Sequence, residues 1–358
     1  MRSSASSGEE RLAPVQEYYQ VLHGVLGIYL TNRCNMRCAH CCVNSGPQER
    51  SRVDLATLLP QFADLANAGA IMAIHVSGGE PFLFPDDIRA IAAIGNLARI
   101  PVAVNTNGFW GRQVSKAELL LRSMPGVTQL IFSADTFHEK FLDTRHLRTG
   151  IAVALSLGIR IKVTVCTEAG LRTEYVKELE NSFGTDLLSQ MEFVVVPVEP
   201  GGRASALKEA YWRPDLRELP PGRCDVINRP VVMENGDVLA CANTVTASRT
   251  DGNYLKIGNI REKKLSAILD DGKSSNFVRA MRVLGPKFLA DQLPSQDRSK
   301  LRAFYPKDDI CQLCEDLVAP SMRAGLERVL HSEQLSRAIF VAEAIAPVET
   351  FGFAGDAR

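Results

Sequence analysis

Residues 31–44 read TNRCNMRCAHCCVN and bring four cysteines into nine positions. Three of them, Cys34, Cys38 and Cys41, are spaced CxxxCxxC. A closed structural metal site normally takes four ligands, and no fourth cysteine follows at a matching interval. The run is therefore either incidental or part of a metal site that keeps one coordination position open.

The bulk composition limits the classes of protein to which this chain can belong. The nine cysteines are an odd number in a chain of 358 residues, which argues against a fully paired disulfide framework. The 41 basic and 41 acidic residues cancel and give no support for a nucleic-acid or membrane-surface partner. No secretory signal opens the chain, and no apolar run approaches the roughly 20 residues of a membrane span. We therefore expect a cytoplasmic protein whose clustered cysteines serve metal or redox chemistry.

Between residues 25 and 200, short β-rich runs alternate with helical stretches. Repeated βα units with apolar strands predict a parallel sheet flanked by helices. Six units suit an α/β fold of the partial (β/α)6 TIM-like type, an open barrel, better than a closed barrel of eight. In such folds the chemistry gathers at the carboxyl ends of the strands, and the cysteine motif follows the first strand. The expected strands are Val25–Leu30, Ile71–Val76, Pro101–Asn105, Gln129–Phe132, Ile159–Val165 and Glu192–Val198.

Amphipathic segments between these strands are expected to be helical. Gly69 and Gly158 follow two of them, as glycine commonly follows a helix. Pro60 is expected to kink or shorten the first segment. The segments are Leu55–Ala68, Asp86–Leu97, Lys116–Arg122, His138–Leu157 and Glu174–Ser182.

After residue 200 the alternation ends and loop-like runs such as EPGGRA and RELPPGRC appear. The run PVVMENGDVLAC predicts a hairpin of two short strands around Asn235–Gly236. Arg323–Ile345 is expected to be helical. We therefore expect an N-terminal extension (1–24), the barrel (25–200), a smaller domain (201–320) and a C-terminal helix with a tail (321–358).

The cysteine motif after the first strand, with SGGEP (Ser77–Pro81) at the end of the second, resembles the radical S-adenosylmethionine (SAM) superfamily. The resemblance covers residues 25–200. It implies a 4Fe–4S cluster held by Cys34, Cys38 and Cys41, whose remaining iron is chelated by SAM. One electron from that cluster splits the cofactor and releases a 5′-deoxyadenosyl radical that abstracts hydrogen. A zinc site completed by His40 or Cys42 is the alternative.

The same resemblance implies a set of SAM-binding residues. Gly78 and Gly79 would let the backbone approach the methionine moiety, and Glu80 would orient this region. His40 takes the place of the family's aromatic residue near the adenine. Polar residues that end the third and fourth strands would line the ribose and methionine, with loop capping as an equal alternative; they are Asn105, Asn107, Ser133 and Asp135.

A second cysteine set lies in the smaller domain. Cys224 and Cys241 are spaced C-x11-G-x4-C around Gly236, and Cys311-Gln-Leu-Cys314 completes four thiolates. The first pair resembles the opening of SPASM and Twitch extensions, and the total count fits the shorter Twitch type. That resemblance implies one auxiliary 4Fe–4S cluster with no open iron; a zinc ribbon is the alternative.

Two cysteines remain, Cys42 and Cys166. A lone cysteine is usually a small buried hydrophobe. Cys166, however, ends the fifth strand and would point towards the barrel mouth, where its thiol could act catalytically by donating a hydrogen atom to a product radical. Glu199 and His138 are candidate proton acceptors, with a solvated loop as the alternative for both.

The leading functional hypothesis is a radical SAM enzyme of natural-product metabolism that abstracts hydrogen from a small molecule and oxidises it through the auxiliary cluster. Reduced flavodoxin or ferredoxin is the expected electron donor. A peptide or protein substrate, with thioether or carbon–carbon crosslinking, is the alternative. Only 33 residues precede the first cysteine, which favours the small molecule. A non-catalytic iron–sulfur electron carrier is a third hypothesis.

Overall fold

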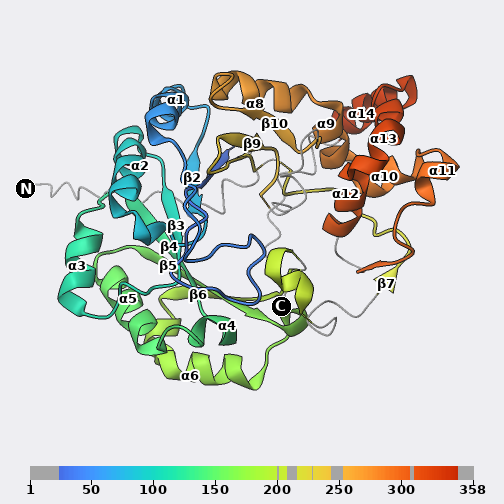
Figure 1. Cartoon of the computed structure of the whole chain (residues 1–358). Helices are drawn as coiled ribbons and strands as arrows, with labels where there is room; N and C mark the ends of the chain where they lie inside the picture. The colour runs from blue at the N-terminus through green and yellow to red at the C-terminus, as the bar shows by residue number, and fades with distance from the viewer. Residues whose placement is uncertain are drawn as a thin grey trace, which may run out of the picture.

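The computed structural model describes residues 24–199, 201–207, 216–227, 229–242, 253–306 and 310–345. One sheet of nine strands runs in the order β10-β9-β8-β1-β2-β3-β4-β5-β6. Its strands β1 to β6 are all parallel to their neighbours, and helices α1, α2, α3, α5 and α6 lie along the outer side of the curved sheet (Figure 1). The predicted α/β architecture is confirmed. The six strands are β1 (Val25–Tyr29), β2 (Ala73–Ser77), β3 (Val102–Thr106), β4 (Val127–Ser133), β5 (Arg160–Thr167) and β6 (Met191–Pro197).

Strand β5 shows how the sequence separates the two faces of this sheet. Ile161, Val163 and Val165 are buried in the main hydrophobic core, together with apolar side chains of α5 and α6. The residues between them are half-buried, as the period of two in a strand requires for the opposite face. Cys166 therefore belongs to the inner, concave face of the sheet, near the carboxyl end of β5.

The helices match the expected segments with three differences. The first is that the helix expected at Glu174–Ser182 continues to Leu188. Helix α1 contains Pro60 in its second turn and still extends over 13 residues, so of the two expected effects, a kink or a shortening, the shortening is wrong. The segment His138–Leu157 is not one helix but two, because Asp143 caps the second by accepting a hydrogen bond of 2.8 Å from the backbone nitrogen of Arg145. The helices are α1 (Leu55–Asn67), α2 (Pro85–Ala98), α3 (Val114–Arg122), α4 (Thr136–Glu139), α5 (Thr144–Ser156) and α6 (Glu174–Leu188).

The predicted hairpin is confirmed. Strand β8 (Val231–Val232) pairs antiparallel with β9 (Asp237–Leu239), and Gly236 has a φ of 90° in the turn between them. Strand β10 (Lys256–Asn259) pairs with β9. Because β8 pairs parallel with β1, this later part of the chain extends the barrel sheet.

A second hydrophobic core lies beyond the hairpin, among the orange and red helices of Figure 1. Phe277, Met281 and Leu317 are among its fully buried side chains. The expected helical region at Arg323–Ile345 forms two helices, separated near His331. The elements here are β7 (Leu216–Arg217), α8 (Leu265–Ser274), α9 (Asn276–Val283), α10 (Pro286–Asp291), α11 (Ser295–Arg298), β11 (Tyr305–Pro306), α12 (Cys311–Val318), α13 (Arg323–Leu330) and α14 (Glu333–Ile345).

Residues 1–23 of the expected N-terminal extension and the tail after residue 345 lie outside the described part of the chain. None of the helices that the structure describes combines the length and apolar character needed to cross a bilayer.

Candidate functional site

The three cysteines of the CxxxCxxC motif lie on the loop after β1, which we call the cysteine loop (residues 31–46). Cys38 is buried, and Cys34 and Cys41 are half-buried. Burial raises the pKa of the Cys34 thiol to about 12, although the backbone N–H of Met36 opposes this shift. Three thiolates so close together are unfavourable without a cation among them. Three soft donors of this kind fit an iron–sulfur cluster.

The glycine turn after β2 packs directly on the cysteine loop. The backbone nitrogen of Gly79 donates to the carbonyl of Thr31 at 2.7 Å, and that of Glu80 donates to the carbonyl of Arg33 at 2.9 Å. A Cβ atom on Gly79 would lie 2.1 Å from the Arg33 oxygen, and one on Gly78 would lie 2.6 Å from the Thr31 oxygen. Both glycines are therefore needed for the approach of one backbone to another within the chain.

Glu80 is fully buried at the end of this turn. Its Oε1 accepts hydrogen bonds from the Phe82 nitrogen and the Thr106 hydroxyl, both at 3.0 Å. Its Oε2 accepts one from the Asn107 nitrogen at 2.7 Å. Burial raises the pKa of Glu80 to about 7, although these hydrogen bonds favour the charged form. The side chain ties the end of β2 to the end of β3.

The two asparagines predicted at the third strand face different neighbours. Asn107 donates a hydrogen bond of 2.8 Å to the Oδ1 of Asn35 in the cysteine loop. Asn105 lies 2.8 Å from the Nε2 of His75 and donates to the Ser77 hydroxyl at 3.2 Å. Asn107 therefore contacts the motif loop, whereas Asn105 links neighbouring strands inside the barrel.

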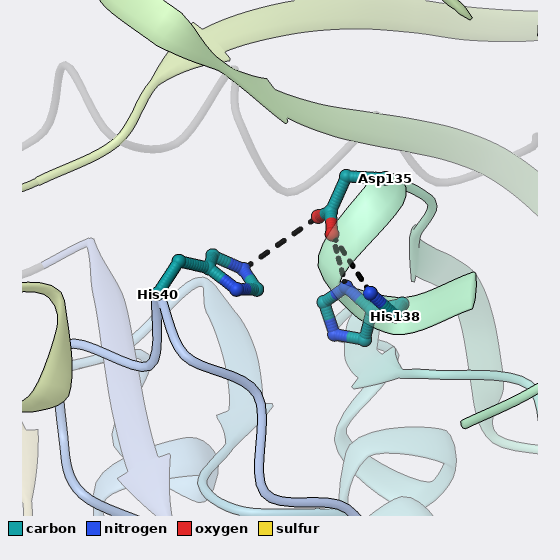
Figure 2. Close-up of side chains that lie close together, drawn as sticks. All are labelled: His40, Asp135 and His138. Carbon is teal, nitrogen blue, oxygen red and sulfur yellow. Dashed lines mark hydrogen bonds and ion pairs between the residues drawn. The ribbon is translucent and has the colours of Figure 1, made fainter. Parts of the chain in front are cut away.

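The end of β4 meets the cysteine loop at a cluster of His40, Asp135 and His138 (Figure 2). Asp135 caps α4 by accepting from the backbone nitrogens of Phe137 and His138, both at 3.0 Å. The Nδ1 of His138 lies 2.9 Å from one Asp135 oxygen, and the Nε2 of His40 lies 3.6 Å from the other. The His40 ring stacks on Phe137 with 4.4 Å between ring centroids.

The surroundings shift the pKa values of these three side chains in different directions, so the side chains carry different charges at neutral pH. Burial raises the pKa of Asp135, but His138 and His40 outweigh it and hold that pKa below its usual range. Burial lowers the pKa of His138, but Asp135 and a hydrogen bond with Cys38 raise it to about 10. Burial lowers the pKa of His40 to about 4. At neutral pH, Asp135 and His138 therefore form an ion pair beside a neutral His40.

The same three side chains offer ligand atoms within 4.8 Å of one another, a spacing that one metal ion could bridge. Such an ion would have to displace the proton of His138, whose pKa is about 10. The ion pair is therefore the favoured state at neutral pH. Of the two candidate proton acceptors, His138 is part of this cluster, whereas Glu199 is exposed.

Ser133 and Cys166 lie at the ends of neighbouring strands. Ser133 ends β4 and is half-buried. Cys166 packs against the apolar cluster that contains Cys38 and Phe137, and its sulfur lies 3.5 Å from the carbonyl oxygen of Pro197. Burial raises the pKa of Cys166, so this side chain remains a protonated thiol. The structure thus places Cys166 beside the cysteine loop.

Arg203 was not identified from the sequence. It lies in a short 3-10 helix, η4 (Gly202–Ala206), after β6. Its Nε donates to the carbonyl of Cys38 at 2.9 Å, and its Nη2 donates to the carbonyl of Ser45 at 2.7 Å. These acceptors are backbone groups, which leave no pattern in the sequence.

The cysteines of the later set converge in the second core. Cys224, Cys241 and Cys314 are buried there. Burial, and then the neighbouring Cys241, raise the pKa of Cys224 to about 12. Burial also raises the pKa of Cys314, with further contributions from Cys224 and Cys241. Cys311 begins α12, one helical turn before Cys314.

Comparison with known proteins shows what this region is similar to. Residues 28–182 match the family described as the radical SAM superfamily. A protein of Bacillus subtilis (strain 168) named for peptide biosynthesis, YydG, is 27% identical over 34% of this chain and 39% of its own length. The GTP 3′,8-cyclase of Limosilactobacillus fermentum is 31% identical over 46% of this chain and 52% of its own length. The matches thus span about half or less of these relatives.

Two solved structures are also similar. The crystal structure of BtrN in complex with AdoMet and 2-DOIA aligns with 73% of this chain and 87% of its own, at 19% identity and a TM-score of 0.42. The radical S-adenosylmethionine methyltransferase TsrM of Kitasatospora setae aligns with 54% of this chain and 39% of its own, at 22% identity and a TM-score of 0.38.

Proposed function

We propose that this protein is a radical SAM enzyme that cleaves SAM reductively to a 5′-deoxyadenosyl radical and abstracts hydrogen from a small-molecule substrate. The observation that carries the proposal is the contact between the three-cysteine loop after β1 and the Gly78–Gly79 turn after β2. Both lie at the carboxyl ends of neighbouring parallel strands, within the part of the chain that matches the family.

Cys34, Cys38 and Cys41 would hold a 4Fe–4S cluster. When bound, this cluster supplies the electron that cleaves SAM. The side chains around it hold the cofactor region in place: Glu80 fixes the glycine turn, and Asp135 fixes the start of α4.

The neutral His40 ring would contribute an aromatic face for the adenine. Phe137 supports this ring from one side by stacking on it. A neutral imidazole can be placed against an apolar base with a smaller desolvation cost than a charged one. The low pKa of His40, about 4, keeps the ring neutral across the physiological range.

The spacing of the sulfurs supports a cluster over a single zinc ion. Zinc ligands at about 2.3 Å in a tetrahedron bring their sulfur atoms to about 3.8 Å from one another. In the described ranges, His40, Asp135 and His138 offer three potential ligand atoms within 4.8 Å of one another. Among the described residues, neither cysteine set brings three sulfur atoms within 4.8 Å of one another.

Cys224, Cys241, Cys311 and Cys314 would hold an auxiliary 4Fe–4S cluster. With four protein ligands it would have no open iron, and its potential would be set by its buried surroundings. Such a cluster could accept the second electron when the substrate radical loses a proton, which completes a two-electron oxidation. A reduced flavodoxin or ferredoxin would supply the first electron.

The relatives support two substrate classes. The name of the GTP 3′,8-cyclases indicates that their substrate is a nucleotide. These enzymes match 46% to 51% of this chain in two of the comparisons, which supports a small molecule as the substrate. YydG, named for peptide biosynthesis, supports a peptide as the second candidate. Either substrate would bind at the concave face of the sheet, where the cysteine loop and Cys166 lie.

An extract of deuterated source cells separates these candidates. The extract would be divided by molecular mass, with and without protease treatment, and each fraction added to reconstituted, reduced enzyme with unlabelled SAM. We expect deuterium in 5′-deoxyadenosine with the low-mass fraction, whether or not it was treated with protease. Deuterium transfer that protease treatment abolishes would assign a peptide substrate. No 5′-deoxyadenosine with any fraction would contradict the proposed enzyme and support an electron carrier.

A further inference from the structure

Arg203 makes three hydrogen bonds to the backbone of the cysteine loop. Its Nε donates to the Cys38 carbonyl at 2.9 Å, and its Nη2 donates to the Ser45 carbonyl at 2.7 Å. Its backbone nitrogen donates to the Cys41 carbonyl at 2.9 Å. Two of the three motif cysteines are therefore held through their carbonyls by a residue that follows the last barrel strand.

The residues beside Arg203 lie equally close to the same loop. Gly202 has a φ of 52°, and a Cβ atom there would lie 2.6 Å from the carbonyl oxygens of Cys41 and Cys42. Ala204 is fully buried in the apolar cluster that contains Cys38. Residues 202–204 therefore form one contact surface on the cysteine loop, and the guanidinium group is only part of it.

The chemistry of this contact suits a cluster site in two ways. A guanidinium group is a rigid, planar fork, so its bonds to two carbonyls fix their distance and direction. It also carries a permanent positive charge, and its hydrogen bond to the Cys38 carbonyl places that charge beside one of the three motif cysteines. A fixed positive charge beside a redox centre stabilises the state that holds one more electron.

We propose that Arg203 is a positioning residue for the three-cysteine site: its fork holds the turn that carries Cys38 and Cys41, and its charge raises the reduction potential of the bound cluster. This inference rests on the proposed function. Arg203 would thus have two effects, one on the position of the turn and one on the reduction potential. Different substitutions can change these two effects independently.

Three variants test these effects. Arg203→Gln removes both charge and fork, and Arg203→Lys keeps the charge without the fork. Arg145→Gln is the control, because Arg145 is an exposed arginine on α5 paired with Asp143. Two quantities would be measured on reconstituted full-length protein: the rate at which a ferrous chelator removes iron, and the midpoint potential of the paramagnetic signal that changes when SAM is added.

We expect Arg203→Gln to lose iron at least about tenfold faster, because the guanidinium group makes two hydrogen bonds to the loop and loss of one charge-assisted bond alone is worth about tenfold. Its midpoint potential should move to more negative values. Arg203→Lys should lose iron faster yet keep a potential close to that of the unaltered protein, and Arg145→Gln should change neither. Faster iron loss with an unchanged midpoint potential in Arg203→Lys identifies a positioning role, because a purely structural defect would change both quantities together.

Unchanged potential and unchanged iron loss in Arg203→Gln would overturn the inference. If that variant fails to fold, Arg203→Lys decides alone, since iron loss at the unaltered rate would refute the role of the fork. Absence of any SAM-sensitive signal in the unaltered protein would instead refute the proposed function, so the two failures are distinguishable.

Discussion

A Cβ atom on Gly79 would lie 2.1 Å from the carbonyl oxygen of Arg33, the residue immediately before the first motif cysteine. No real Cβ atom approaches an oxygen so closely, so any other residue at position 79 must push the cysteine loop away from the end of β2. The geometry of the three-cysteine site thus depends on the glycine turn.

Replacement of Gly79 by alanine should therefore cost the protein its first cluster. Gly46→Ala is the matched control, because Gly46 lies in the same loop and a Cβ atom there would meet nothing within 4 Å. With two clusters the unaltered protein should bind about eight irons, Gly46→Ala about eight and Gly79→Ala about four. Iron analysis after anaerobic reconstitution checks this, and equal iron in both variants would show that the contact is unimportant.

Substitution of Cys314 should separate the two clusters. Cys314 is buried with Cys224 and Cys241 in the second core, away from the motif cysteines of the barrel. Cys314→Ala should bind about half the iron, still cleave SAM without substrate, and fail to give the oxidised product. Triple replacement of Cys34, Cys38 and Cys41 should instead abolish cleavage. If Cys314→Ala loses cleavage and product formation to the same extent, the second site is chiefly structural.

The half-buried thiol of Cys166 can be tested by isotope exchange. Because burial raises its pKa, Cys166 carries a proton that exchanges with solvent. If the substrate radical is quenched by a hydrogen atom from Cys166 instead of being oxidised by the auxiliary cluster, product formed in D2O should carry one solvent-derived deuterium. Cys166→Ala should then lose that label while it still forms 5′-deoxyadenosine. Cys42→Ala is the control and should keep the label. Product labelled equally in all three proteins would exclude this role.

The pairing of α14 with α9 should make stability depend on pH. Glu343 accepts hydrogen bonds from Arg279 and Arg282, at 2.7 and 2.5 Å for the shortest contacts, and the Arg279 bond is the main reason that its pKa is lowered. A lowered folded pKa means that this stabilisation is present above the unfolded value, near 4.5, and is lost as the pH falls through the folded value.

Glu343→Gln should lower the free energy of unfolding at pH 7 by about 1 kcal/mol, and the difference from the unaltered protein should shrink as the pH approaches 4. Glu333→Gln is the control on the same helix, because the Glu333–Arg337 pair is mostly exposed and should contribute little. Urea unfolding at several pH values measures both. A difference that does not change with pH would mean that Glu343 stabilises α14 by packing and not by charge.

The barrel strands could be predicted closely because apolar, β-branched runs between helical segments carry a direct local signal. Strand β5, for example, was expected at Ile159–Val165 and lies at Arg160–Thr167. The division between α4 and α5 was missed, although Asp135 and Asp143 are typical N-cap residues. The Asp135–His138 ion pair could also have been predicted, because an acidic N-cap residue lies three positions before a histidine.

Other parts of the site could not be predicted, because they depend on backbone groups that are distant in sequence. Arg203 binds carbonyls 158 and 165 positions away, and any residue offers a carbonyl. The pairing of β8 with β1, which joins the later hairpin to the barrel sheet, likewise depends on tertiary register. Cysteine spacing, by contrast, is a side-chain pattern, and the proposed function depends on it most.

Hyperfine spectroscopy with labelled SAM tests the central claim most directly. The reduced, reconstituted protein would be frozen with SAM carrying 15N in its amino group and 13C in its carboxylate, and nuclear couplings to the paramagnetic cluster would be recorded. Couplings from both labels, absent after replacement of Cys34, Cys38 and Cys41, would show a cluster whose free iron binds SAM. Zinc at the three-cysteine site, or a cluster signal without coupling to either label, would contradict the account.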